Sequence, residues 1–210
     1  MNFANRINLI KTTPAYKESM HLHFKIYKPF GMLSQLHSND AKESRNKRFL
    51  SELYNLPDGI MPIGRLDEKS EGLLLLTTNG KLSDHINRSG VQKEYYVQLD
   101  GEITEEAIIT LGQGVQIGFH GIKYKTKPST VRRLHSLPAL AEPDKRIRAG
   151  RHRPSSWISI TITEGKFRQV RKMTAAVGFP TLRLIRVRIG NILLEDLCPG
   201  NITPLDNLLL

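Results

Sequence analysis

Four consecutive leucines, Leu73–Leu76, lie between Gly72 and Gly80, and they constrain the fold more than any other stretch. A short, uninterrupted apolar run between two glycines is typical of a central strand buried on both faces. The polar segment before the run, Asp67–Glu71, is therefore predicted to leave one end of a core strand. Loops held by a rigid scaffold often carry reactive groups, so Asp67 is either a catalytic carboxylate or a residue that ties a turn.

The size and charge of the chain indicate a folded protein with an anionic partner. It has 210 residues, 39% of them hydrophobic, and a formal net charge of +11. A basic excess of this size favours nucleic acid, with an anionic membrane surface as the weaker alternative. No apolar run approaches the ~20 residues that a membrane-spanning helix needs.

Several common classes of site are absent from the sequence. The single cysteine, Cys198, cannot form a disulfide within the chain, which is typical of a reducing compartment and predicts a cytoplasmic protein. No spacing between this cysteine and the histidines resembles that of a zinc site. There is no glycine-rich phosphate loop, no dinucleotide fingerprint and no acidic cluster suited to paired magnesium ions. We therefore expect no metal and no cofactor.

Strand and helix patterns alternate without a strict strand–helix–strand rhythm. Besides the leucine run, strands are predicted at residues 21–27, 95–99, 129–135, 157–163 and 181–189, and helices at 49–56, 81–88, from 104 to 112 or 114, and 166–177. This mixture favours an α+β fold with a mostly antiparallel or mixed sheet.

No repeat, low-complexity segment or clear linker divides the chain. We expect residues 1–20 to be a disordered extension and residues 21–210 to form a single catalytic domain. The polar stretch 37–47 lacks any period, so a mobile loop is expected there.

Two basic groups of residues are candidates for contact with phosphate. The excursion 123–153 carries ten Lys and Arg against two acidic residues, and it ends in Arg148, Arg151 and Arg153. A like-charged run is usually a solvated face, but its position inside the domain favours nucleic acid. The second group belongs to the predicted helix 166–177, whose spacing sets basic side chains on one face: Arg168, Arg171 and Lys172.

A nucleic-acid enzyme without a metal or nucleotide site must work with its own side chains. A carboxylate nucleophile is one such device. If it is desolvated, it needs a nearby cation to stay ionised, and arginine keeps its charge when buried. Asp67, with Arg65 two positions before it, suits this chemistry.

Four segments occur in a specific order: YKPFGMLSQ at 27–35, GRLDEKSEGLLLLTTNG at 64–80, KEYYV at 93–97 and ITEGKFRQVRKMTAAVGFPTLRLIRVRIG at 162–190. Over residues 21 to about 195 they resemble the motifs of pseudouridine synthases, in particular the RsuA/RluB/RluE group that modifies ribosomal RNA. The resemblance implies a pseudouridine synthase fold with a central catalytic cleft and no separate amino-terminal RNA-binding domain. It implies isomerisation of uridine in ribosomal RNA, with large-subunit (23S) RNA as the expected substrate, by a monomer that needs no cofactor.

The resemblance also assigns roles to single residues. Asp67 matches the catalytic aspartate, Tyr95 the tyrosine that packs against the target base, and Arg171 the basic residue paired with the aspartate. Arg65 matches the arginine that helps to expel the base from its helix, and Leu184 matches an apolar wall of the base pocket.

RNA contacts are expected from basic residues around this set: Arg65, Lys93, Lys166, Arg168, Lys172, Arg148, Arg151 and Arg153. Two positions depart from the family pattern, since Lys166 stands where relatives often have Arg, and Phe167 where a polar residue is commoner. These departures bear on RNA contacts more than on chemistry. The alternative function is an inactive RNA-binding or ribosome-assembly protein with the same fold, but a binding module has no need for Asp67, Tyr95 and Arg171 together.

Overall fold

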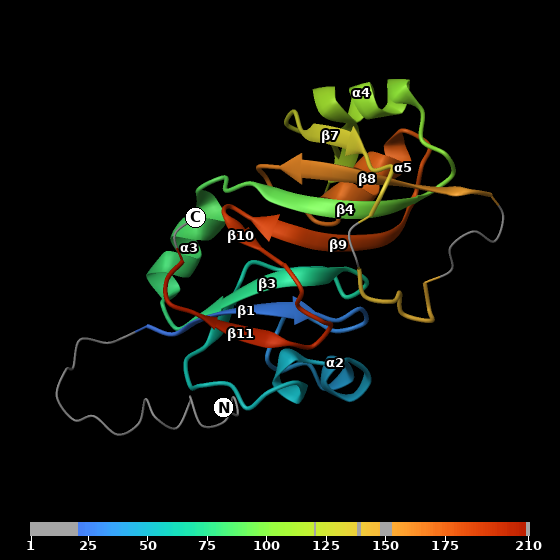
Figure 1. The fold of residues 1–210 in the computed structure, drawn as a ribbon. Coiled ribbons are helices and arrows are strands. Elements are labelled where there is room, and N and C mark those ends of the chain that lie inside the picture. The colour runs from blue at the N-terminus through green and yellow to red at the C-terminus, as the bar shows by residue number, and fades with distance from the viewer. Residues whose placement is uncertain (1–20, 120, 138–139, 148–152, 209–210) are drawn as a thin grey trace.

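The structure is a computed structural model that describes residues 21–119, 121–137, 140–147 and 153–208 (Figure 1). The expected extension, residues 1–20, lies outside the described residues, as do Arg148 and Arg151.

The strands are β1 His23–Lys28, β2 Met61–Ile63, β3 Glu71–Thr77, β4 Lys93–Asp100, β5 Gln116–Phe119, β6 Ile122–Lys125, β7 Thr130–Arg133, β8 Ser155–Ile162, β9 Thr181–Ile189, β10 Ile192–Leu193 and β11 Ile202–Leu205. The helices are α2 Ala41–Asn46, α3 Gly80–Arg88, α4 Glu105–Gln113 and α5 Gln169–Ala176, with a 3-10 turn, η1, at Leu50–Glu52.

A nine-stranded mixed sheet forms the centre of the molecule, in the order β11-β1-β3-β9-β4-β8-β7, with β2 added to β3 and β10 to β9. In Figure 1 it runs from β11 near the bottom to β7 near the top. Within the described strands, β3 and β9 form the one parallel pair, which is short and joins Glu71 to Ile185 and Gly72 to Arg186. This short junction connects two antiparallel halves, and the predicted α+β fold with a mostly antiparallel sheet is confirmed.

Strand β3 is the buried core strand that the leucine run predicts. All of its residues are buried, and Leu73–Leu76 are 0% exposed. Leu73 and Leu75 pack with Ile86 of α3 on one face, whereas Leu74 and Leu76 pack with Phe24 on the other. Burial of each leucine contributes about 1.5–3 kcal/mol, which makes β3 a rigid support for the loop before it.

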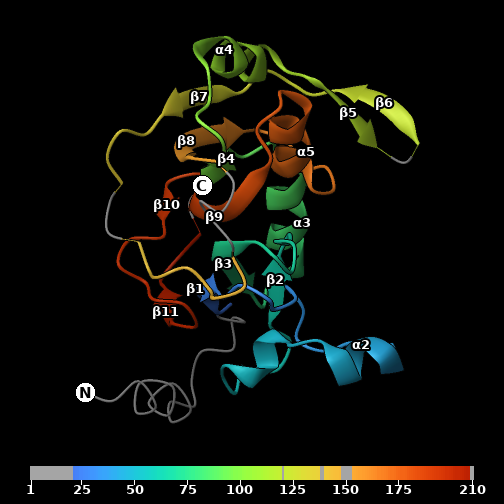
Figure 2. The same cartoon turned by 90° about the vertical axis from the view of Figure 1, so that its right-hand side faces the viewer.

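The helices and a separate hairpin complete the architecture. Helices α3 and α5 lie on the same face of the sheet, and the β5–β6 hairpin projects beside α5 (Figure 2). Helix α4 is capped by Thr104, as predicted, and packs Ile108 and Leu111 into the upper core.

Two local predictions are wrong. The expected loop 37–47 contains α2, whose first turn is capped by the Asp40 side chain through hydrogen bonds from the amides of Lys42 and Glu43. The expected helix 49–56 is reduced to the single turn η1, since Pro57 follows too soon for a longer helix.

Candidate active site

Asp67 lies on a seven-residue connection, Gly64–Ser70, between β2 and β3. The loop is held from beneath by Ser34, whose buried hydroxyl lies 2.9 Å from both the amide nitrogen and the carbonyl oxygen of Leu66. The amide of Gly31 donates to the carbonyl of Glu68 at 2.7 Å. The segment 27–35 therefore fixes the backbone on which Asp67 is carried, and Ser34 is a functional contributor that sequence reasoning missed.

Gly72 allows β3 and β9 to approach closely just behind the loop. Its φ is +102°, and a Cβ there would lie 2.4 Å from the Arg186 carbonyl oxygen and 2.8 Å from the Arg186 nitrogen. A side chain at this position would be strained by the backbone conformation and would also push the two strands apart.

A buried ionic group supports the same end of β3. The Glu71 carboxylate accepts hydrogen bonds from Arg183 Nε at 2.7 Å and from the Tyr27 hydroxyl at 3.0 Å. Glu71 and Arg183 are 3% and 4% exposed, so each charge is neutralised by the other out of contact with water. Burial and the neighbouring carboxylate raise the pKa of Tyr27. From the sequence, Glu71 is expected only as part of the polar segment before the leucine run, whereas it lies in a buried ion pair.

Among the described residues, Arg168 forms an ion pair with Asp67, with 3.9 Å between Arg168 Nη1 and Asp67 Oδ2. It adopts a left-handed conformation, φ 54°, immediately before α5, so the helix begins at Gln169 and not at Lys166 as predicted. Arg168 is therefore not on the same helical face as Arg171. A positive φ at a residue other than glycine costs about 1–3 kcal/mol and is often found at functional sites.

Arg171, predicted as the basic partner of Asp67, makes its direct contacts with the backbone of the loop that carries the aspartate. Its guanidinium donates to the carbonyl of Lys69 at 2.6 Å and to that of Thr181 at 3.3 Å, and it contacts the Ser70 hydroxyl at 3.5 Å. Arg171 thus anchors the backbone of the loop, and its positive charge interacts electrostatically with the Asp67 carboxylate. Burial and the charge of Arg168 lower the pKa of Arg171, and Asp67 partly offsets this.

Asp67 lines a small cavity of about 90 Å³ together with Arg65, Tyr95 and Leu184. Tyr95 belongs to β4 and Leu184 to β9, on the other side of the junction between the two halves of the sheet. The register of β4 against β9 shifts between Glu94 and Tyr95, a bulge of the kind that re-aims side chains beside active sites. The cavity has the volume of about three liquid waters.

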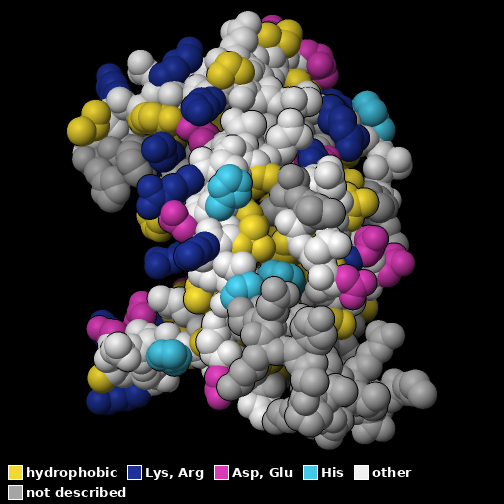
Figure 3. All heavy atoms as spheres, turned by 90° about the vertical axis from the view of Figure 1, so that its left-hand side faces the viewer, with side chains coloured by type: hydrophobic (Ala, Val, Ile, Leu, Met, Phe, Trp, Pro, Cys, Tyr) yellow, Lys and Arg dark blue, Asp and Glu magenta, His cyan; other side chains and the backbone are white. Residues whose placement is uncertain are grey.

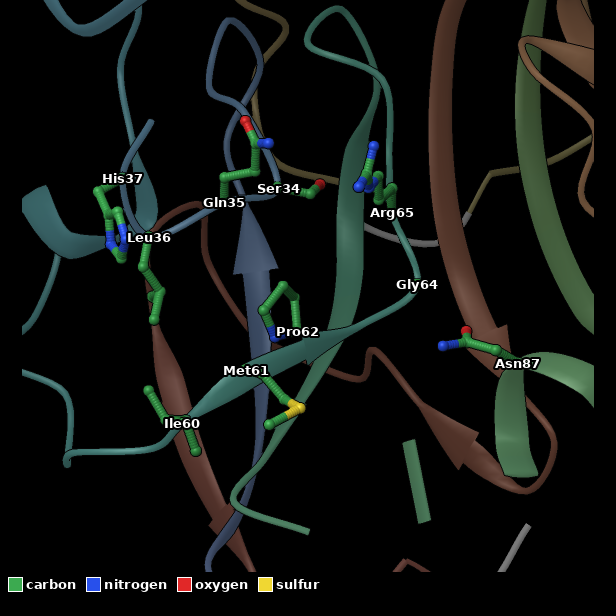
Figure 4. Close-up of a pocket in the computed structure, with 10 residues that line it drawn as sticks. All are labelled: Ser34, Gln35, Leu36, His37, Ile60, Met61, Pro62, Gly64, Arg65 and Asn87. Atoms are coloured by element: carbon green, nitrogen blue, oxygen red, sulfur yellow. The ribbon is translucent and has the colours of Figure 1, made fainter. Parts of the chain in front are cut away.

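Two larger cavities adjoin this catalytic pocket, and Arg65 lines all three. One, of about 460 Å³, is lined by Lys93, Lys166 and Tyr95 among others. The other is a groove of about 450 Å³ between the segment 34–37 and β2. Figure 4 shows His37 and Asn87 on opposite sides of this groove, with Arg65 at one end.

Two more of the predicted RNA-binding residues that the structure describes, Lys172 and Arg153, do not line the Asp67 pocket. Lys172 donates to the carbonyl of Gly118 at 2.8 Å and lies over the Phe167 ring. Arg153 pairs with Asp100 at 3.2 Å, near the far end of β4. Figure 3 views the molecule from the side opposite to Figure 2, so the edge that carries the β5–β6 hairpin lies at its left. Lys and Arg side chains gather along this edge, and the basic surface therefore extends beyond the site.

The described part of the chain has neither a metal-binding cluster nor a membrane-spanning helix. Its residues include no group of three or more His, Cys, Asp or Glu side chains placed to hold a metal ion. None of its helices has the length and apolarity required to cross a bilayer.

A loop aspartate, Asp67, and an aromatic residue, Tyr95, thus line one cavity at the junction of a mixed sheet. The RNA pseudouridylate synthase family model matches residues 23–176, and the chain belongs to this family. The family predicted from the ordered motifs is thereby confirmed.

Individual relatives agree with this membership. The chain is 42% identical over 175 residues to ribosomal large subunit pseudouridine synthase E of Xanthomonas campestris pv. campestris, covering 82% of this chain and 89% of that protein. The protein of the same description from Vibrio parahaemolyticus is 38% identical, with 82% of this chain and 69% of that protein covered. A crystal structure of a pseudouridylate synthase superposes with a TM-score of 0.69 at 27% identity, covering 88% of this chain and 70% of that one.

Proposed function

We propose that this chain isomerises a specific uridine of large-subunit (23S) ribosomal RNA to pseudouridine, with Asp67 as the catalytic carboxylate. The name of the Xanthomonas campestris relative supports the substrate, since the match spans 89% of that protein. The observation that carries the proposal is the placement of Asp67. It lies on a loop pinned by buried contacts, and it faces a cavity whose other walls include Tyr95 and Leu184.

The proposed reaction replaces the C–N bond between uracil and the sugar by a C–C bond. The nucleotide first leaves the base stack to reach the pocket. The C–N bond between base and sugar then breaks, the base turns, and a C–C bond forms; a ring carbon gives up a hydrogen and the ring nitrogen gains one. Because product and substrate contain the same atoms, no oxidant or energy source is needed, and we propose that no cofactor or metal takes part.

The residues of the pocket divide the work. Asp67 acts in breaking the base–sugar bond, as a nucleophile at the sugar or the ring or as a base. Arg168 supplies the nearest positive charge to it. Arg171 is a positioning residue that holds the loop through its backbone. Tyr95 and Leu184 pack against the base.

The surroundings of the pocket are proposed to bind the RNA. Arg65, at the junction of the three cavities, is suited to enter the space that the target base leaves. The net charge of +11 supports a broad phosphate-binding surface. We further infer that residues 21–210 act as one catalytic domain, as a monomer, in the cytoplasm.

The test is single-turnover pseudouridine formation by the purified protein on 23S ribosomal RNA and on large-subunit particles. Wild type should modify one uridine, also after dialysis against EDTA, and Asp67→Asn should form no detectable product while still binding RNA. Glu68→Gln is the matched control, because the Glu68 carboxylate pairs with Lys47 at 2.7 Å. Turnover by Asp67→Asn would assign the chemistry to another group, and RNA binding without turnover by wild type would favour the binding-protein alternative.

A further inference from the structure

The 460 Å³ cavity beside the catalytic pocket shares Arg65, Tyr95, Gly165 and Lys166 with it. The two cavities are therefore adjacent, with these four residues lining both. A nucleotide whose base enters the catalytic pocket remains bonded to its neighbours, so the adjoining backbone must pass close to the larger cavity.

Arg186, on β9, is a buried cation in the wall of this cavity. It is 2% exposed, and its Nε donates to the carbonyl of Leu73 at 2.7 Å and its Nη1 to that of Arg65 at 3.4 Å. Its Nη2 is buried and has no hydrogen-bond partner among the described residues. Its acceptors are neutral carbonyls, which leave the positive charge of the guanidinium without an offsetting full charge.

Lys93, on β4, is a second cation in the same wall. Its Nζ donates to the carbonyl of Val91 at 2.9 Å, which again carries no full charge. Burial lowers the pKa of Lys93, and the charge of Arg186 lowers it further. The two cations thus repel each other in a partly desolvated place, and an anion bound between them would relieve both the repulsion and the missing counter-charge.

The rim of the cavity adds positive charge. It includes Arg65, Lys127 and Lys166, together with Arg88, whose charge is already paired with Asp84 at 2.8 Å, and its one acidic lining residue is Glu164. That carboxylate is already engaged, because it accepts hydrogen bonds from the Tyr124 hydroxyl, the Lys127 amide and the Gln169 side chain. The cavity as a whole is therefore suited to an anion supplied from outside.

We propose that this cavity binds one backbone phosphate of the RNA directly next to the target uridine, with Lys93 as the donor and Arg186 as the fixed charge beneath it. The inference rests on the proposed function, which makes RNA the ligand. Phosphate contacts fix the register of a protein on nucleic acid without reading its sequence. Bound here, the phosphate would set the register that brings a single uridine to Asp67.

The test removes charges one at a time from both partners. A series of short substrate RNAs each carries one neutral methylphosphonate linkage, placed 5′ or 3′ of the target uridine or several nucleotides away, and affinity is measured by equilibrium binding. For wild type, one flanking neutral linkage should weaken binding roughly ten- to a hundredfold, as expected for a charge-assisted contact, and distant linkages much less. For Lys93→Gln, that same linkage should have little further effect, and Lys93→Arg should restore most of the loss.

Lys42→Gln is the control, because Lys42 is exposed on α2 and is not among the residues that line the cavity. It should leave the sensitivity to the flanking linkage unchanged. Equal losses at all linkages in wild type, or the same flanking loss in Lys93→Gln as in wild type, would overturn the proposal. The wild-type series needs no variant, so equal losses at all linkages would overturn the proposal even if Lys93→Gln does not fold. Turnover of unmodified RNA is scored separately, so failure of the phosphate site and failure of the proposed function are distinguishable.

Discussion

At the scale of single residues, two arginines close together in sequence take different tasks. Arg168 lies 3.9 Å from Asp67, whereas Arg171 donates to the backbone of Lys69 and contacts Ser70. The motif predicted which residues gather at the site, but not which arginine faces the carboxylate. That choice depends on the left-handed backbone of Arg168, which side-chain spacing does not reveal.

Replacement of each arginine by glutamine should separate these tasks. Arg168→Gln should lower the single-turnover rate at saturating enzyme roughly tenfold or more, because the developing reaction loses the charge beside Asp67. Its free energy of unfolding should stay within about 0.5 kcal/mol of wild type. Arg171→Gln should lower the free energy of unfolding by roughly 2 kcal/mol, since charged hydrogen bonds to the loop are lost. Urea unfolding and quenched-flow product analysis measure both, and a wild-type rate in Arg168→Gln would contradict the assignment.

Lys28 should give stability an unusual pH dependence. It is 0% exposed, and its Nζ donates to the carbonyls of Pro29 and Met32 at 2.8 and 2.7 Å. Burial is the main cause that lowers the pKa of Lys28 to about 7, while Arg186 lowers it further and nearby carboxylates, first Glu71, oppose the shift. The unfolded chain titrates this amine near ~10.4. Between these values the unfolded state binds more protons, so stability rises with pH, by at most about 1.4 kcal/mol per pH unit.

The measurement is urea unfolding at several pH values between about 7 and 9.5. Lys28→Met should flatten the rise in the free energy of unfolding relative to wild type. Lys42→Met, which removes an exposed amine from α2, should keep the wild-type slope. An unchanged slope in Lys28→Met would mean that Lys28 stays charged in the folded state throughout this range.

At the scale of elements, Gly72 is where the two strands of the junction come closest. Gly72→Ala should lower the free energy of unfolding by roughly 3 kcal/mol, because backbone strain and a clash with Arg186 add together. Gly59→Ala is the matched control: its φ of +75° is also left-handed, but nothing lies within 4 Å of the added Cβ. It should cost only about 1 kcal/mol. Equal losses in the two variants, measured by urea unfolding, would show that close packing at the junction is unimportant.

The elements with strong periodic patterns were predictable, and those set by local or tertiary contacts were not. The leucine run forms β3 and the alternating segment 181–189 forms β9, because burial of apolar side chains in the sheet stabilises strands with these patterns. Helix α2 was missed although Asp40 and Glu43 are a recognisable capping pair, because none of its residues is buried and no apolar stripe marks it. The start of α5 was misplaced because Arg168 leaves the helical conformation to face Asp67.

At the scale of the whole molecule, the site lies at the seam between the two antiparallel halves of the sheet. Segments far apart in sequence meet there: 27–35 supports the loop, 64–72 carries Asp67, and 168–186 supplies the arginines and Leu184. Four residues that the ordered motifs assign to the site, Arg65, Asp67, Tyr95 and Leu184, line one small cavity. The buried partners Ser34 and Glu71 could not be predicted, because a serine or a glutamate in a polar stretch gives no sign that a second segment covers it.

RNA binding should be strongly salt-dependent across this basic surface. Each neutralised phosphate on a single strand contributes about −0.7 to the slope of log K against log salt concentration. Replacement of Arg148, Arg151 and Arg153 by Ala should make the slope less negative, by up to about 2 if all three contact phosphate. Fluorescence anisotropy titrations at several salt concentrations measure it. A slope equal to that of wild type would assign these arginines to solvated surface without an RNA contact.

The most direct test of the central claim is a map of pseudouridines in large-subunit ribosomal RNA from cells that lack the gene. We predict that one pseudouridine is lost, that wild-type protein restores it, and that Asp67→Asn expressed at the same level does not. Restoration by Asp67→Asn, or a pseudouridine pattern that does not change when the gene is removed, would contradict the account.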